Sequence, residues 1–117
     1  MQPVPEIDDL IHQRVRLGIL TVLTEARRAD FTTLRDVLGL SDGNLSRNLV
    51  LLEQHGHVKV EKRFESRRPR TWVQITPQGA AALDLEVTAL RDIVRRIERS
   101  AIRTPQPFDP GIAPSGP

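Results

Sequence analysis

The chain of 117 residues contains no cysteine. Its absence excludes disulfide bridges, thiol catalysis, thiolate metal sites and cysteine redox sensing together. Aromatic residues are scarce, with one tryptophan, three phenylalanines and no tyrosine. No apolar run approaches the roughly 20 residues that a membrane-spanning helix needs, and the first residues lack the pattern of a secretory signal. We therefore expect a cytoplasmic protein without a membrane partner.

Positive charge is concentrated in one segment. The whole chain carries 17 basic and 15 acidic residues, for a net charge of +2. Between Lys59 and Arg70, six basic residues stand against two acidic ones. A basic segment on a near-neutral body favours a polyanionic partner, and a solvated charged loop is the alternative.

The length fits one domain. We expect this domain to span residues 1–103, because residues 104–117 contain five prolines and little apolar content. Proline lacks the amide proton and resists both helix and sheet, so this tail is expected to be disordered.

Three helices are predicted in the first half of the chain. Apolar residues recur at three- and four-residue spacing over residues 7–28, which predicts one long helix. Asp30 can cap a second, short helix that ends at Gly39, where a left-handed conformation is favoured. A third helix follows, capped by Ser41 or Asp42. Two short helices joined by a tight glycine turn make a helix-turn-helix pattern.

The period then changes to that of strands. Residues 58–60 and 72–75 alternate between apolar and polar, which predicts a two-stranded hairpin with an arginine-rich tip. No Asn-Gly or Asp-Gly dipeptide is present, so we expect a loop longer than two residues, stiffened by Pro69. Trp72 is expected to brace the strands.

A long last helix follows, capped by Thr76 with Pro77 at its first position. Its apolar residues form a heptad seam, broadened by Ile93: Leu83, Val87, Leu90, Val94, Ile97 and Ala101. A helix of roughly 25 residues would be about 37 Å long, longer than so small a domain can cover. We expect part of the seam to bury against a second subunit; docking on its own domain is the alternative.

Helix, helix-turn-helix, hairpin and long helix is the order of a mainly α winged helix-turn-helix fold. The segments Arg16–Leu20, Phe31–Arg35, Leu38–Arg47, Leu52–Val58 and Arg67–Gly79 closely resemble small bacterial winged-helix transcriptional regulators of the MarR/ArsR-like type. His57 and Val73 depart from the usual pattern, at positions where DNA contact is not expected. The resemblance implies a homodimeric, DNA-binding repressor or activator.

The predicted recognition helix, residues 42–55, would enter the major groove of double-stranded DNA, and the wing, residues 62–70, would contact the minor groove or backbone. Arginine suits guanine and asparagine suits adenine, whereas hydroxyl groups and helix N-termini suit phosphates. The residues predicted to contact DNA are Thr32, Thr33, Arg35, Ser41, Gly43, Asn44, Ser46, Arg47, Asn48, Lys62, Arg63, Arg67, Arg68 and Arg70. Val50 and Leu51 also point outward, either toward thymine methyl groups or partly covered by the hairpin.

Other functions are kept as alternatives. The fold could serve as a protein-interaction module, or an unidentified small-molecule effector could bind between helices at the dimer interface. For Arg47 a surface salt bridge is the alternative to base contact. No catalytic constellation, cofactor motif or metal site is predicted, because His55 and His57 have no third ligand nearby and suit a helix end and a turn.

Overall fold

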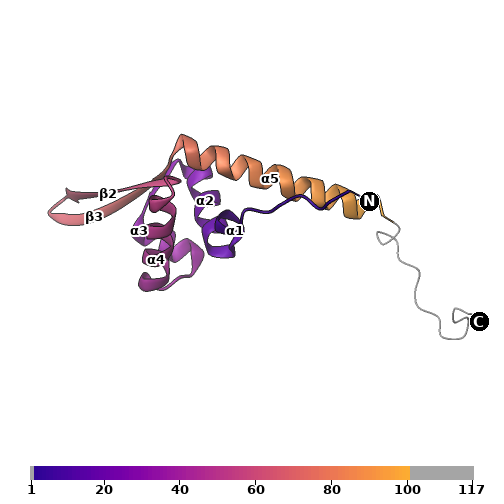
Figure 1. Cartoon of the computed structure of the whole chain (residues 1–117). Coiled ribbons are helices and arrows are strands. Elements are labelled where there is room, and N and C mark those ends of the chain that lie inside the picture. Colours follow the sequence, from indigo (N-terminus) through magenta and orange to yellow (C-terminus); the bar gives the residue numbers. More distant parts are fainter. Residues whose placement is uncertain (1, 101–117) are drawn as a thin grey trace, which may run out of the picture.

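The computed structural model describes residues 2–100 of the chain. Their order is helix, helix-turn-helix, hairpin and long helix, as predicted (Figure 1). The elements are α1 (Asp9–His12), α2 (Arg14–Ala26), β1 (Arg28–Asp30), α3 (Phe31–Leu38), α4 (Asp42–Gln54), β2 (Val58–Glu65), β3 (Arg68–Ile75) and α5 (Pro77–Glu98). Within residues 2–100, no helix is long and apolar enough to cross a membrane. The predicted tail, residues 104–117, and the seam residue Ala101 lie outside the described residues.

The single helix predicted over residues 7–28 is in fact two helices that meet at Gln13. The backbone of Gln13 is extended, with φ −55° and ψ 131°, and its side chain accepts hydrogen bonds from the N–H groups of Val15 and Arg16. Gln13 therefore caps α2 and interrupts the chain of helical bonds. Ile11 of α1 is fully buried in the same core as Ile19 of α2, so the apolar spacing continues through the break.

The predicted helix caps are confirmed. Asp30, Ser41 and Thr76 each accept a hydrogen bond from the backbone N–H three residues later, at 2.9, 3.1 and 2.9 Å. Each satisfies an amide that would otherwise lack a partner at a helix N-terminus. Gly39 ends α3 in the left-handed region, at φ +64°. The turn between α3 and α4 is thus determined by its local sequence.

The sheet is antiparallel, with strand order β1-β3-β2. β2 and β3 pair from Val58 opposite Ile75 up to Glu65 opposite Arg68. Only Ser66 and Arg67 connect them, both at positive φ, 51° and 65°. The prediction of a longer loop is therefore wrong. Positive φ at both central residues is the geometry of a two-residue hairpin turn, here adopted without the favoured glycine.

Pro69 lies in strand β3 and not in a loop, so the expected loop stiffening is also wrong. It stands opposite Phe64, one pair beyond the turn. On the other side of β3, β1 reaches only as far as Trp72, so no strand there needs an N–H from residue 69. A proline is tolerated in such an unpaired stretch of strand.

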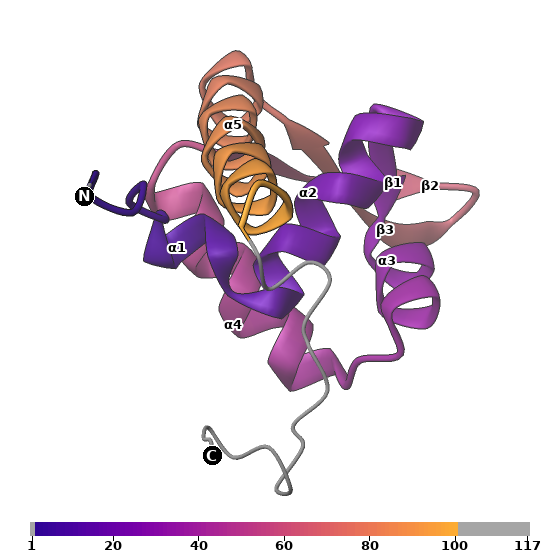
Figure 2. The ribbon, with the colours of Figure 1, turned by 90° about the vertical axis from the view of Figure 1, so that its right-hand side faces the viewer.

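The hydrophobic core contains residues from the helices and from the sheet. Its fully buried side chains come from α1, α2, α3, α4 and β3: Ile11, Ile19, Leu20, Leu23, Leu34, Leu45, Leu52 and Val73. The first part of α5 packs over α1 and α2, with Leu83 against this core. Beyond that, α5 projects away from the body at the end opposite the hairpin, beside the N-terminal segment (Figures 1 and 2). At 22 residues, its length is about 33 Å.

A buried carboxylate joins the start of α1 to α5. Glu86 is only 2% exposed, and its Oε1 accepts a hydrogen bond of 3.1 Å from the backbone N–H of Asp8. Asp8 in turn caps α1 through Leu10 and Ile11. The N-terminal segment is therefore attached to the long helix by polar as well as apolar contacts.

Candidate nucleic-acid interface

One face of α4 is fully available to a partner. Leu45, Leu49 and Leu52 turn into the core, as predicted. The opposite stripe, at 100° per residue, consists of Gly43, Arg47, Val50 and Gln54, and all four are exposed. The helix therefore presents a continuous outer face of more than three turns.

Arg47 dominates the first half of that face. In the part of the chain that the structure describes, no carboxylate lies within 4.0 Å of its guanidinium. This geometry does not support the alternative of a surface salt bridge. Its Nη1 lies 3.3 Å from the position that a Cβ would take on Gly43. Gly43 thus makes room for the arginine to lie back toward the helix N-terminus, the direction that helical side chains favour.

The sequence predicted that Asn48 lies at the border of the exposed face, but in the structure this side chain is buried. It is 9% exposed. Its Nδ2 donates to the backbone carbonyl of Asn44 at 2.9 Å and to Asn44 Oδ1 at 2.7 Å, while its Oδ1 accepts from Arg16 Nη1 at 3.0 Å. Arg16 of α2 covers this side of α4, so Asn48 holds two helices together and cannot reach DNA in this arrangement. Asn44 remains half-buried at the edge of the outer face.

The start of α3 is exposed at Thr32 and Thr33. Arg35, by contrast, is held by two carboxylates, with Nε 3.0 Å from Asp36 and Nη1 3.0 Å from Asp42. The hydrogen bonds to Asp42 and Asp36 raise the pKa of Arg35. A phosphate contact by Arg35 would have to compete with both carboxylates. Ser41 and Ser46, also predicted to meet phosphates, are exposed on α4 and its cap.

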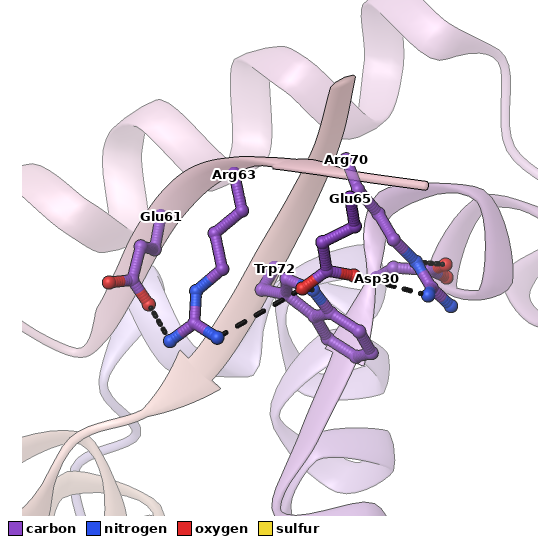
Figure 3. A network of polar contacts seen from close by, with 6 residues as sticks. All are labelled: Asp30, Glu61, Arg63, Glu65, Arg70 and Trp72. Atoms are coloured by element: carbon purple, nitrogen blue, oxygen red, sulfur yellow. Dashed lines mark hydrogen bonds and ion pairs between the residues drawn. The ribbon is translucent and has the colours of Figure 1, made fainter. Parts of the chain in front are cut away.

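A polar network fastens the hairpin to β1 (Figure 3). Arg70 Nε lies 2.9 Å from Asp30 Oδ2, and Arg70 Nη1 lies 3.4 Å from Glu65 Oε1. Trp72 donates from Nε1 to Glu65 Oε2 at 3.2 Å. The guanidinium groups of Arg28 and Arg70 stack on the Trp72 ring, 4.3 and 4.4 Å from its centroid. Trp72 braces the strands, as expected, and Arg70 belongs to this network.

The basic segment of the hairpin divides into paired and unpaired cations. Arg63 lies 3.0 Å from Glu61 and 4.0 Å from Glu65, so it resembles Arg70 in being engaged (Figure 3). Among the described residues, no carboxylate lies within 4.0 Å of Lys62, Arg67 or Arg68. We call these three, which are the unpaired cations of the hairpin predicted to contact DNA, the unpaired hairpin cations. All three are exposed, and Arg67 and Arg68 lie at the turn.

Asp30 links helix α3 to the hairpin. One carboxylate oxygen caps α3 at Thr33 and the other binds Arg70 of the hairpin. The hydrogen bonds from Thr33, together with the ion pair to Arg70, lower the pKa of Asp30 below its ordinary value of 3.8. Its contribution to stability is therefore complete above that value and is lost as the pH falls through the folded-state pKa.

We predict that Asp30→Asn, a neutral mimic of the protonated acid, lowers the free energy of unfolding by about 1 kcal/mol at pH 7. Urea unfolding should show this difference shrinking between pH 5 and pH 2. Asp84→Asn, at an exposed carboxylate without an ion pair in the described chain, is the control and should show no such gap. A difference for Asp30→Asn that persisted unchanged at pH 2 would contradict the assigned role of the charge.

The comparisons with known proteins agree with this geometry. Residues 15–94 match a family model described as a winged helix DNA-binding domain. The chain belongs to this winged-helix family. An uncharacterized protein of Methanocaldococcus jannaschii is 32% identical over 84 residues, which cover 72% of this chain and 91% of that protein. In the naming used for this fold, the second helix of the helix-turn-helix, here α4, is called the recognition helix, and the β2–β3 hairpin is called the wing.

Two solved structures share the winged-helix fold. A transcriptional regulator homologue from Pyrococcus horikoshii OT3 is 34% identical with a TM-score of 0.73, over 76% of this chain and 88% of that chain. A MarR-family transcriptional regulator from Silicibacter pomeroyi is 25% identical with a TM-score of 0.59, over 79% of this chain and 61% of that chain. The predicted resemblance to winged-helix regulators of the MarR type is confirmed.

Of the two histidines near the end of α4, His55 lies at the helix C-terminus and His57 is buried in the turn that follows. The Nδ1 of His55 lies 2.9 Å from the Leu51 carbonyl at the C-cap, as its predicted place at a helix end requires. His57 is 8% exposed, and burial lowers the pKa of its imidazole. Residues 2–100 contain no cluster of three or more His, Asp or Glu side chains that could hold a metal ion.

Sequence reasoning missed several contributors to this surface. Arg16, Arg28 and Glu65 act through contacts with distant elements, and strand β1 is only three residues long. Asp30 was identified as a cap, but its second oxygen meets a residue 40 positions away. No local pattern marks such contacts.

Proposed function

We propose that this winged-helix protein is a homodimeric regulator of transcription that binds a specific pseudo-palindromic site on double-stranded DNA. The recognition helix would lie in the major groove, with Arg47 at base edges. The wing would lie on the adjacent minor groove or backbone. Two recognition helices would stand about one helical turn apart, roughly 34–36 Å.

The observation that carries this proposal is the division of the cations. Arg47 and the unpaired hairpin cations are exposed and carry no carboxylate partner within the described residues, whereas Arg35, Arg63 and Arg70 are ion-paired. A cation that binds a phosphate releases condensed counterions from the DNA, and a cation without a carboxylate partner need not break an ion pair to do so. We expect Thr32, Thr33, Ser41, Ser46 and Asn44, which are exposed or half-buried, to assist.

The second subunit is inferred from the seam of α5. Leu83 packs on the core of its own domain, and Val87, Leu90 and Ile93 are half-buried. Farther along the helix, Val94 is 52% exposed and Ile97 is 53% exposed. A shallow apolar groove runs beside them, lined by Val87, Leu90, Arg91, Val94, Arg95 and Glu98. A second copy of α5 offers a matching apolar stripe.

Regulation of transcription is supported by the relatives. The Pyrococcus horikoshii protein, at 34% identity, is described as a transcriptional regulator homologue. A role confined to protein interaction would leave the unpaired cations of the wing without a purpose. An effector pocket at the dimer interface and a cytoplasmic location stay predictions.

The test begins with selection of bound duplexes from a random DNA pool, followed by fluorescence anisotropy with the winner. We expect Arg47→Ala to reduce affinity for the winner by about 1–3 kcal/mol and to relax sequence preference. Arg67→Ala and Arg68→Ala should weaken binding to all duplexes similarly and lower the salt slope by about one each.

Arg99→Ala is the control for loss of one positive charge. Arg99 is exposed and caps the C-terminus of α5, the end that lies away from the wing (Figure 1). This variant should bind the selected duplex as the wild type does. Failure to enrich any duplex, with equal binding by all four variants, would refute a sequence-specific regulator.

A further inference from the structure

An apolar strip lies in the middle of the surface assigned to DNA. Val50 is 53% exposed and Leu51 is 38% exposed. Together with Ser46 and Arg47 they line a shallow recess on the outer face of α4. Val50 and Arg47 are three residues apart, so their side chains are neighbours on the helix surface.

The wing lies beside Val50 and leaves about half of its side chain exposed. A second recess, between α4 and the wing, has Val50 on one wall and Val60 and Lys62 on the other. The two walls do not close on each other, because more than half of Val50 remains exposed. The partial cover by the hairpin that the sequence left open for this residue is therefore compatible with contact to a partner, because the rest of the side chain faces outward.

The neighbours of Val50 indicate what kind of partner would cover it. Arg47 precedes it on the same stripe, Lys62 faces it from the wing, and neither carries a carboxylate partner among the described residues. The Glu53 carboxylate also lines the recess beside the wing, where it accepts a hydrogen bond of 2.9 Å from the N–H of Val60. Such a border suits a polyanion better than the apolar patch of a protein. The major groove presents one apolar group, the C5-methyl of thymine, beside bases that arginine can read.

Resting on the proposed function, we infer that Val50 is a specificity-determining residue that contacts the C5-methyl group of a thymine in each half-site. Arg47 binds a neighbouring base on the same stripe. The thymine lies on the side of the Arg47 contact that corresponds to the C-terminal half of α4. Burying the methyl against Val50 replaces water on both apolar surfaces.

The test replaces thymidine by deoxyuridine, one position at a time, in the duplex obtained by selection. This change removes only the C5-methyl and leaves the phosphates and Watson–Crick groups intact. With the wild-type protein we expect binding to weaken about fourfold for one methyl and about 15-fold when the symmetry-related thymine is also replaced. Val50→Ala should bind the thymine and uracil duplexes with nearly equal Kd.

Val37→Ala is the matched control, because Val37 of α3 is 63% exposed and lies off the recognition helix. It should retain the full preference for thymine. If the wild type binds the selected duplex but no uracil replacement changes its Kd, the inference is overturned while the proposed function stands. An equal uracil penalty in Val50→Ala and wild type would also overturn it. Absence of any selected duplex would instead refute the proposed function.

Discussion

Adding one methyl group at Gly79 should destabilise the protein by about 3 kcal/mol, at the upper end of the cost of overfilling a packed site. A Cβ at this position would lie 2.0 Å from the carbonyl oxygen of His57 and 2.8 Å from its carbonyl carbon. Both are backbone atoms, and the same oxygen accepts a hydrogen bond of 3.1 Å from the N–H of Thr76. Relief would therefore require moving the start of α5 away from the turn before β2.

Urea unfolding followed by circular dichroism measures this cost. Gly43→Ala is the matched control, since it is the same change near the start of another helix. A Cβ at Gly43 would meet only the end of the flexible Arg47 side chain, at 3.3 Å. Because alanine is the better helix former, Gly43→Ala should be neutral or stabilise by up to about 1 kcal/mol. Equal stability of Gly79→Ala and wild type would show that α5 is not held this closely to His57.

The Gly79 contact has a functional consequence. It joins the first turn of α5 to the segment that follows the recognition helix, so the orientation of α5 and that of α4 are linked through backbone. In the proposed dimer built on α5, we expect this contact to influence the distance between the two recognition helices. Glycine is needed here for the close approach of two elements, because Gly79 does not adopt a positive φ.

Local sequence predicted most of the fold. The caps at Asp30, Ser41 and Thr76 act within three residues, and the apolar periods of α3, α4 and α5 repeat within each helix, so a sequence pattern records them directly. β1 has three residues and exists because β3 hydrogen-bonds to it. The break at Gln13 is concealed because both α1 and α2 bury apolar residues in one core.

The candidate interface was predictable only in part, because some of its side chains are held by residues far away in the sequence. The outward position of Arg47 follows from helical geometry alone. The burial of Asn48 depends on Arg16, which is 32 residues earlier in the chain, and the pairing of Arg70 depends on Asp30. Charge counting identified the basic segment of the wing, but which of its cations are unpaired is a tertiary property.

Placing a carboxylate on the seam of α5 should abolish the proposed dimer. We expect Val94→Asp combined with Ile97→Asp to yield a folded monomer, because both side chains are more than half exposed in one subunit and surface changes cost little stability. In a dimer the same carboxylates would be removed from water between two apolar stripes, which is costly. Analytical ultracentrifugation should show the change in mass.

Loss of the dimer would also separate the two half-site contacts. Linked binding exceeds the affinity of one site by a factor of about 10²–10⁴. We therefore expect the double variant to bind the selected duplex more weakly by a factor of at least about 100. Leu85→Asp is the control: Leu85 is 72% exposed on α5 and, at 100° per residue, lies on the far side from the seam. It should remain dimeric and bind DNA normally. A double variant that stays dimeric would place the subunit interface elsewhere, whereas a monomer that retains full affinity would mean that one recognition helix and one wing suffice.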